Sequence, residues 1–309
     1  MAYSFKKPEK SAEKNLRRVA LSQIDKAIAE AGDDGLPRAE RVHQVRKRGK
    51  KLRGLVRLVR PAFPGYAAEN AAFRDIARTL APARDAAVLQ QAYDAVMDAY
   101  AETVDRPPFA PIRAELTRRR NALDEEAIET ALYDARSALS EAAVRAEAWE
   151  LDESGFDAVA GGLKKTAKRA RARMADAEAD PTPAALHAWR KRVKYHRYHM
   201  RLLAPLWPAA FEARETAADR LGDLLGAHHD LAVLAETLRA GPDAFGDAKT
   251  LSAFLALVAR RQKELEAEAF PLGRRLFAEK PRHLATRTEA LWDIWKREAK
   301  ADDKLKAAA

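Results

Sequence analysis

The sequence predicts an all-α protein in which two pseudo-symmetric antiparallel helical bundles form one domain. Ala, Leu, Arg, Glu and Lys dominate its 309 residues, and alternating β-branched runs are hard to find. Apolar residues recur at three- and four-residue spacing, as in amphipathic helices, and one long stretch occurs twice. We therefore expect a tail at 1–10, a domain at 11–295 with halves of about 11–150 and 151–295, and a charged tail at 296–309.

Capping and breaking residues define the first two expected helices. The first helix opens with a turn at Ser11 and stops at Gly32, because serine suits a helix start and glycine a helix end. The second helix runs from Pro37 to Pro61. Proline is tolerated in a first helical turn but cannot continue a helix.

Prolines also divide the rest of the chain. The segment 67–102 is helical with a kink or break at Pro82, and 105–111 is a loop. One long helix is expected over 112–149. In the second half, prolines mark further loops between helices, at Pro181, Pro183, Pro205 and Pro208.

The charge balance predicts an anionic partner. Lys and Arg number 56 against 46 Asp and Glu, giving a net charge of +10, which favours nucleic acid, a membrane surface or polyphosphate without choosing among them. The chain has no cysteine, which excludes disulfides, Cys-ligated metals and thiol nucleophiles. We find no signal-peptide stretch and no run of 18 apolar residues, so we expect a cytoplasmic protein without a membrane span.

The repeated stretch is the most informative feature. The segment "VHQVRKRGKKLRGLVRLVRPAFP" at 42–64 aligns with "LHAWRKRVKYHRYHMRLLAPLWP" at 186–208. A histidine, six basic residues and two prolines match: His43/His187, Arg46/Arg190, Lys47/Lys191, Arg48/Arg192, Lys50/Lys194, Arg53/Arg197, Arg57/Arg201, Pro61/Pro205 and Pro64/Pro208. After a one-residue slip, 75–89 aligns with 220–234 and pairs Asp85 with Asp230. Such an internal repeat predicts two bundles about a pseudo-twofold axis.

Each copy of the repeat forms a basic stripe when drawn as a helix. At about 100° per residue, the histidine and five basic residues fall within about 120° of arc. Apolar residues oppose them: Val42, Val45, Leu52, Val56 and Val59 in the first copy, and Leu186, Trp189, Val193, Met200 and Leu203 in the second. The stripes contain no Glu at i,i+4 to offset repulsion, so we expect a bound anion rather than a solvated face. Each histidine either contacts this anion or begins the helix.

The doubled motif H-x-x-R-K-x-x-K-x-x-R-x-x-x-R, followed by "ARD" and "HHD", resembles the CHAD family, the conserved histidine α-helical domain. The likeness extends from Ser11 to Trp295, and no CYTH domain accompanies it. The resemblance implies a basic central groove or channel that binds inorganic polyphosphate, and an association with polyphosphate granules or, in some members, polyester granules. The binding residues it implies are His43, Arg46, Lys47, Lys50, Arg53, Arg57, His187, Arg190, Lys191, Lys194, Arg197 and Arg201. Secondary candidates are Lys14, Arg17, Arg18, Lys165, Lys168 and Arg169.

The stripes also favour polyphosphate on chemical grounds. Arg grips phosphate oxygens bidentately, whereas Lys supplies a point charge. Tyr195 and Tyr198 are the aromatic residues near the second stripe, and the first has none. Because single-stranded nucleic acids need stacking platforms, nucleic acid is a secondary candidate.

No pattern predicts catalysis, a metal or a cofactor. The acidic run at Glu264, Glu266 and Glu268 lacks the Lys of an E-x-E-x-K strand, and we interpret it as surface charge. Candidate metal ligands diverge on their helices or lack a third partner, at His228, His229, Asp230, His196 and His199. We expect Asp85 and Asp230 to pair with a basic residue such as Arg84. The sequence therefore predicts a non-catalytic targeting or scaffolding protein, with a nucleic-acid-associated protein and a polyphosphate hydrolase as alternatives.

Overall fold

The computed structural model describes residues 3–7 and 11–308, and the side chains of 82–86 and 302–308 lie outside this description. In the described residues the prediction of an all-α protein is confirmed, since no strand occurs. The α-helices are α1 Ala12–Ala31, α2 Arg38–Leu58, α3 Tyr66–Thr79, α4 Ala81–Ala99, α5 Ala110–Asn121, α6 Glu125–Glu147, α7 Asp157–Ala179, α8 Pro183–Leu203, α9 Pro208–Ala240, α10 Ala248–Leu276 and α11 Pro281–Ala308. Short 3-10 helices are η2 Pro107–Phe109, η3 Ala204–Leu206 and η4 Pro242–Phe245.

Local signals position the first helix ends as expected. The Ser11 hydroxyl accepts a hydrogen bond from the Lys14 backbone N–H at 3.0 Å, and Gly32 caps the other end of α1. The predicted break at Pro82 is also confirmed, because this proline lies in the first turn of α4. At the C-terminal end, α11 continues past Lys296, where the charged tail was expected to begin.

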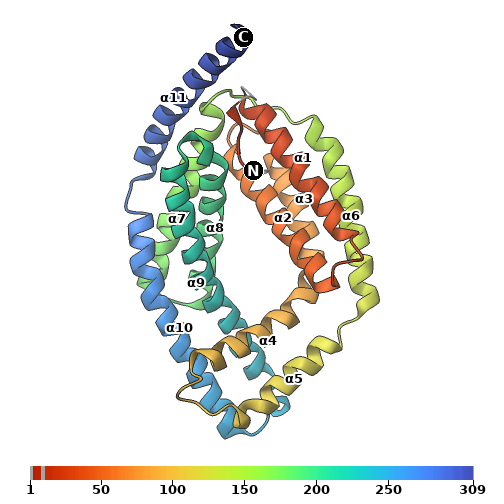
Figure 1. The fold of residues 1–309 in the computed structure, drawn as a ribbon. Helices are drawn as coiled ribbons and strands as arrows, with labels where there is room; N and C mark the ends of the chain where they lie inside the picture. The colour runs from red at the N-terminus through yellow and green to blue at the C-terminus, as the bar shows by residue number, and fades with distance from the viewer. Residues whose placement is uncertain (1–2, 8–10, 309) are drawn as a thin grey trace.

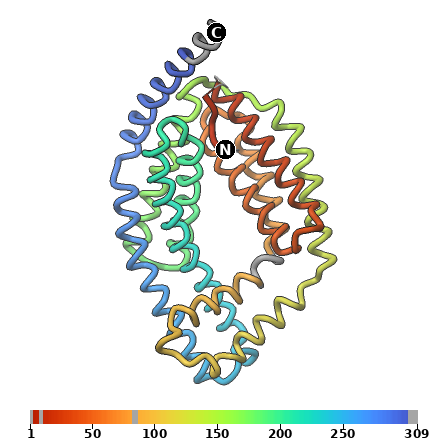
Figure 2. Tube along the Cα trace, in the orientation of Figure 1, coloured from red at the N-terminus to blue at the C-terminus, as the bar shows by residue number. Residues whose placement is uncertain are grey.

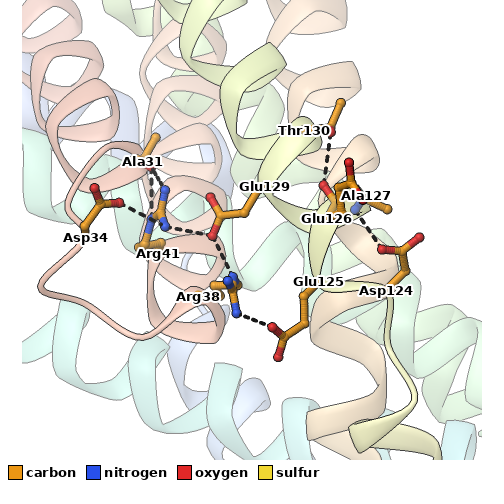
Figure 3. A network of polar contacts seen from close by, with 10 residues as sticks. All are labelled: Ala31, Asp34, Arg38, Arg41, Asp124, Glu125, Glu126, Ala127, Glu129 and Thr130. Atoms are coloured by element: carbon orange, nitrogen blue, oxygen red, sulfur yellow. Dashed lines mark hydrogen bonds and ion pairs between the residues drawn. The ribbon is translucent and has the colours of Figure 1, made fainter.

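The single long helix expected over 112–149 is wrong. Helix α5 ends at Asn121, and Asp124 begins α6 by accepting a hydrogen bond from the Ala127 backbone N–H at 3.0 Å (Figure 3). An aspartate that satisfies a free N–H stabilises a new helix start. The start of α6 is also fixed to α2, because Arg38 binds Glu125 at 2.6 Å and Glu129 at 2.7 Å.

The helices form two groups joined by a contact between α2 and α8. Figure 1 shows α1, α2, α3 and α6 together on one side, with α7, α8 and α9 on the other. Helices α4 and α10 pack on α9 at the far end, where α5 packs on α4, and the trace in Figure 2 ends with α11, which packs on α7. In sequence order, α1 packs on α2 and α2 on α3, just as α7 packs on α8 and α8 on α9.

Glycines allow the two groups to approach closely. A Cβ at Gly54 of α2 would lie 2.8 Å from Cδ2 of Tyr198 in α8, so glycine lets this ring lie across α2. A Cβ at Gly162 of α7 would lie 1.8 Å from the Leu58 carbonyl oxygen, so α7 touches the last turn of α2 backbone to backbone. The apolar sides predicted for α2 and α8 are buried throughout, and their basic sides are left to face the spaces beside the α2–α8 contact.

Candidate anion-binding site

Helices α1, α2, α8 and α9 surround a cavity of about 600 Å³ whose wall is mostly basic. Its basic lining comes from both copies of the repeated motif and from α1. The basic lining residues are Lys26, His43, Lys47, Arg48, Lys50, Lys51, Lys194, Arg197 and Arg201, joined by Tyr3, Gln23, Tyr198, Glu215 and Asp223. We call this space the basic cavity. It can offset the charge of an anion from two helices at once.

Half of the twelve residues predicted as primary ligands line the basic cavity, namely His43, Lys47, Lys50, Lys194, Arg197 and Arg201. The other half do not: Arg46, Arg53, Arg57, His187, Arg190 and Lys191. Of these, Arg46 donates to the Ala77 carbonyl of α3 at 2.5 Å.

The split follows from where α8 contacts α2. Tyr198 covers Gly54, which lies about 20° around the helix from His43, within the basic stripe. Around the helix, Lys47 and Lys51 lie on one side of Gly54 and line the basic cavity, whereas Arg53 and Arg57 lie on the other side and do not. His43 and Lys50 also line the cavity, because they lie a turn or more before Gly54 along the helix. One stripe on an isolated helix therefore becomes two surfaces in the folded protein.

His187 is not equivalent to His43 in its surroundings. Its ring packs at a tilt of 32° against His229 of α9, with centroids 3.8 Å apart, beside a separate cavity of about 410 Å³. Burial, followed by repulsion from His229, lowers the pKa of His187 to about 4. His43 is exposed and lines the basic cavity, so only the histidine of the first motif is positioned to meet an anion there.

Carboxylates from α9 neutralise part of the basic cavity. Glu215 accepts a hydrogen bond from Nη1 of Arg201 at 3.1 Å and lies 3.9 Å from Nε of Arg197. Asp219 forms an ion pair with Arg197. Burial raises the pKa of Asp219, against the opposite effect of Arg197. The arginines of α8 are thus partly occupied before any ligand binds.

The pKa of Lys51 shows the effect of burial and of the neighbouring positive charges. Burial, reinforced by repulsion from Arg48, Lys47 and Arg201, lowers the pKa of Lys51 to about 8. Its ammonium lies 5.2 Å from the centre of the Tyr3 ring. With this pKa, a fraction of Lys51 is deprotonated near neutral pH. An anion that binds beside Lys51 would stabilise its charged form.

Sequence reasoning missed several lining residues. Lys51 lies one turn beyond Lys47, and this i,i+4 spacing could have placed it at the edge of the stripe. Arg48 is fixed by Glu30 of α1 and by Gln23 at 3.2 Å. Lys26 and Tyr3 belong to other segments and carry no such signal.

The secondary candidates do not reach the basic cavity. Arg17 donates to the Trp149 carbonyl at 2.6 Å, and Arg18 donates to the Ser4 carbonyl at 2.7 Å, so both tie elements together. The remaining four are exposed on α1 or α7: Lys14, Lys165, Lys168 and Arg169. Arg169 reappears in a second basic cluster described below.

The acidic and histidine motifs form internal contacts. The interpretation of Glu266 as surface charge is wrong, since this residue is 9 % exposed and one of its oxygens lies 3.2 Å from Nε2 of His228. His196 and His199 are buried, and burial lowers the pKa of each to about 3. Asp230 forms no ion pair within the described side chains, and Asp85 lies outside them.

Within the described part of the chain, no group of three His, Asp or Glu residues is placed to hold a metal ion. The described helices include none with the length and apolar character that crossing a membrane requires.

Comparison with known proteins gives one family and two similar folds. The CHAD domain model matches residues 15–239. The structure of PptA from Streptomyces chartreusis is similar at 18 % identity and a TM-score of 0.56, covering 85 % of this chain and 98 % of that one. The CHAD domain from the plant Ricinus communis is similar at 18 % identity and a TM-score of 0.58, covering 90 % and 95 %. No curated protein sequence matches this chain.

Proposed function

Because this chain belongs to the CHAD domain family, we propose that it binds inorganic polyphosphate in the basic cavity and does not hydrolyse it. The observation that carries the proposal is the cavity itself, where α2 and α8 bring basic side chains of both repeated motifs together with Lys26 of α1. A linear polyanion presents one charged group after another and can contact both helices along its length. Lys and Arg along the wall would replace its counterions.

The aromatic side chains favour polyphosphate over nucleic acid. Tyr3 and Tyr198 line the basic cavity, but they are 5 % and 7 % exposed and pack edge to face against each other. A base needs an accessible ring face on which to stack. The described cavity wall offers phosphate contacts without such a platform.

The carboxylates of the cavity wall favour binding without catalysis. Glu215 and Asp223, its acidic lining residues, both come from α9, and Glu215 already contacts Arg201. A binding protein of this kind would act in targeting or scaffolding on cytoplasmic polyphosphate granules. Polyester granules are the alternative location, and a basic nucleic-acid-associated role is the alternative function.

A competition titration tests the ligand class. Labelled long-chain polyphosphate is bound to the full chain and displaced by unlabelled polyphosphate, duplex DNA or RNA at matched phosphate and salt concentrations. We expect only polyphosphate to compete efficiently. Equal displacement by DNA or RNA would favour the nucleic-acid alternative.

A charge-matched pair of variants tests the place of binding. Lys47→Gln with Lys194→Gln removes one ammonium from each helix, and we expect polyphosphate affinity to fall about tenfold from two lost phosphate contacts. The control, Lys249→Gln with Lys280→Gln, removes two exposed charges elsewhere and should leave affinity within about twofold. Equal losses in the two variants would show that net charge alone drives binding.

Orthophosphate release measured with Mg²⁺ or Mn²⁺ tests the absence of catalysis. We expect none above a blank. Release that Asp230→Ala abolishes would instead establish a hydrolase.

A further inference from the structure

A second group of basic side chains gathers on the side of the α2–α8 contact that faces away from the basic cavity. Arg57 lies six residues after Lys51, which places it about 120° around α2 from that cavity residue. We call the group the arginine cluster. It consists of Arg57 from α2, Arg60 from the following turn, Arg169 from α7 and Arg192 from α8, and none of these residues lines the basic cavity.

Packing brings the three segments together. Because Gly162 lets α7 touch the last turn of α2, Arg169, about two turns further along the same face of α7, comes beside Arg60. From α8, Tyr195 lies under the Arg57 guanidinium, 4.3 Å from ring centroid to Cζ. The Arg57 guanidinium donates to the Tyr66 hydroxyl of α3 at 2.6 Å.

Within the described side chains, no carboxylate forms an ion pair with a member of the arginine cluster. Arg57 is 8 % exposed, and the buried Nε atoms of Arg57, Arg60 and Arg192 have no hydrogen-bond partner in the described structure. Burial lowers the pKa of both Arg60 and Arg192, and repulsion from Arg169 and Arg57 lowers each further. Unpaired charges brought close together destabilise the fold unless an anion joins them.

Two acids on the helices that border the cluster are paired with other arginines. Asp176 pairs with Arg173 at 2.7 Å on the exposed side of α7. Asp75 of α3 pairs with Arg74 at 3.0 Å and with Arg78 at 3.2 Å. Neither carboxylate pairs with a member of the arginine cluster.

We propose that the arginine cluster is a second phosphate site, separate from the basic cavity, which takes one or two adjacent phosphate groups. Guanidinium forks match phosphate oxygens bidentately, and the cluster brings four arginines from α2, the turn after it, α7 and α8 together without a paired carboxylate in the described side chains. Orthophosphate and pyrophosphate have the required size and charge, as does a segment of a longer phosphate chain. The site does not depend on polyphosphate binding in the basic cavity.

Pyrophosphate titration by calorimetry tests the site directly. We expect Arg60→Gln with Arg192→Gln to weaken pyrophosphate binding by at least about tenfold, since two guanidinium contacts are lost. The cavity variant, Lys47→Gln with Lys194→Gln, has the same net charge and should retain pyrophosphate binding at the cluster. Failure of the wild-type protein to bind pyrophosphate, or equal losses in the two variants, would overturn a separate site.

A reversed charge controls for a purely structural effect. Arg169→Glu places a carboxylate beside Arg192, so pyrophosphate binding should be lost while the unfolding temperature stays equal or rises. Arg169→Lys keeps the charge but loses the bidentate fork, so it should weaken binding less than Arg169→Glu does. A folded Arg169→Glu protein that binds pyrophosphate as tightly as wild type would overturn the proposal.

A last arm separates the two sources of phosphate. The protein is saturated with long-chain polyphosphate and then titrated with pyrophosphate. If pyrophosphate no longer binds, the chain itself occupies the arginine cluster. If pyrophosphate still binds with the Arg60 and Arg192 dependence, the cluster takes free phosphate species.

Discussion

Arg48 and Arg192 occupy matching positions in the repeated motif, yet the side chains beside them carry opposite charge. Arg48 binds Glu30 of α1 and Gln23. Arg192 faces Arg169 and Arg173 of α7 instead. The arginine at this motif position therefore has a carboxylate partner in the first half of the protein, and none among the described side chains in the second half.

The flanking helices α9 and α3 extend this contrast. In the register that sets 75–89 against 220–234, Glu215 corresponds to Asn70 and Asp219 to Arg74. Glu215 and Asp219 pair with arginines of α8, whereas Asn70 contacts Arg53 at 3.3 Å as a neutral acceptor. The basic cavity is thus partly self-neutralised, while the arginine cluster is not. Similar motifs alone do not imply equivalent sites.

The largest expected effect comes from removing the carboxylate that distinguishes Arg48. Glu30→Gln leaves a guanidinium whose side chain is 14 % exposed without its counter-charge, and we expect the free energy of unfolding to fall by about 2–3 kcal/mol. Urea denaturation measures this change.

An exposed ion pair provides the control for Glu30. Glu268→Gln removes the partner of Arg220, where both side chains are largely exposed, and should change stability by less than about 0.5 kcal/mol. If Glu30→Gln changed the free energy of unfolding as little as Glu268→Gln does, Glu30 would not stabilise Arg48. The proposed difference between Arg48 and Arg192 would then be wrong.

A smaller effect concerns ligand affinity in the basic cavity. Glu215→Gln with Asp219→Asn frees Arg197 and Arg201 from competing carboxylates. Polyphosphate affinity should rise about tenfold, and the slope of log K against log salt should steepen by about 1.4 if two further phosphates are contacted. Fluorescence anisotropy across a salt series measures both quantities.

A matched control separates this local effect from net charge. Glu289→Gln with Asp293→Asn removes two exposed carboxylates at the same i,i+4 spacing on α11. It should leave the salt slope unchanged. An identical rise in both variants would mean that α9 does not compete with the ligand.

Helix positions could be predicted because their signals are local. Ser11, Gly32 and Pro82 act on their own turns, so sequence alone identifies the ends they mark. The separation of α5 from α6 was missed although Asp124 carries a capping signal, because the helical pattern on both sides masked it.

The site could be predicted only in part, since periodicity identifies a face but not its neighbour. Periodicity predicts one basic stripe on α2, but Tyr198 lies across it at Gly54, and that contact depends on tertiary packing. Glu215 and Glu266 show the same limit. Their partners, Arg201 and His228, are fixed by helix packing rather than by sequence spacing.

The smallest expected effect is a pH dependence of polyphosphate binding that involves Lys51. Its pKa of about 8 in the folded protein means that its ammonium is lost as the pH rises from 7 to 9. Polyphosphate affinity should fall about twofold to fivefold over this range, roughly one phosphate contact. Lys51→Arg keeps its charge and should remove this part of the pH dependence.

Stability should change in the opposite direction, which separates lost binding from unfolding. The pKa of Lys51 is lowered below the value of 10.5 for a free lysine, so between about pH 8 and pH 10 the unfolded chain binds more protons and stability rises with pH. Weaker binding at pH 9 in a protein that is no less stable would therefore assign the loss to Lys51 in the basic cavity. If Lys51→Arg loses the same polyphosphate affinity at pH 9, another group causes the loss. The deprotonation of Lys51 would then not control binding in the basic cavity.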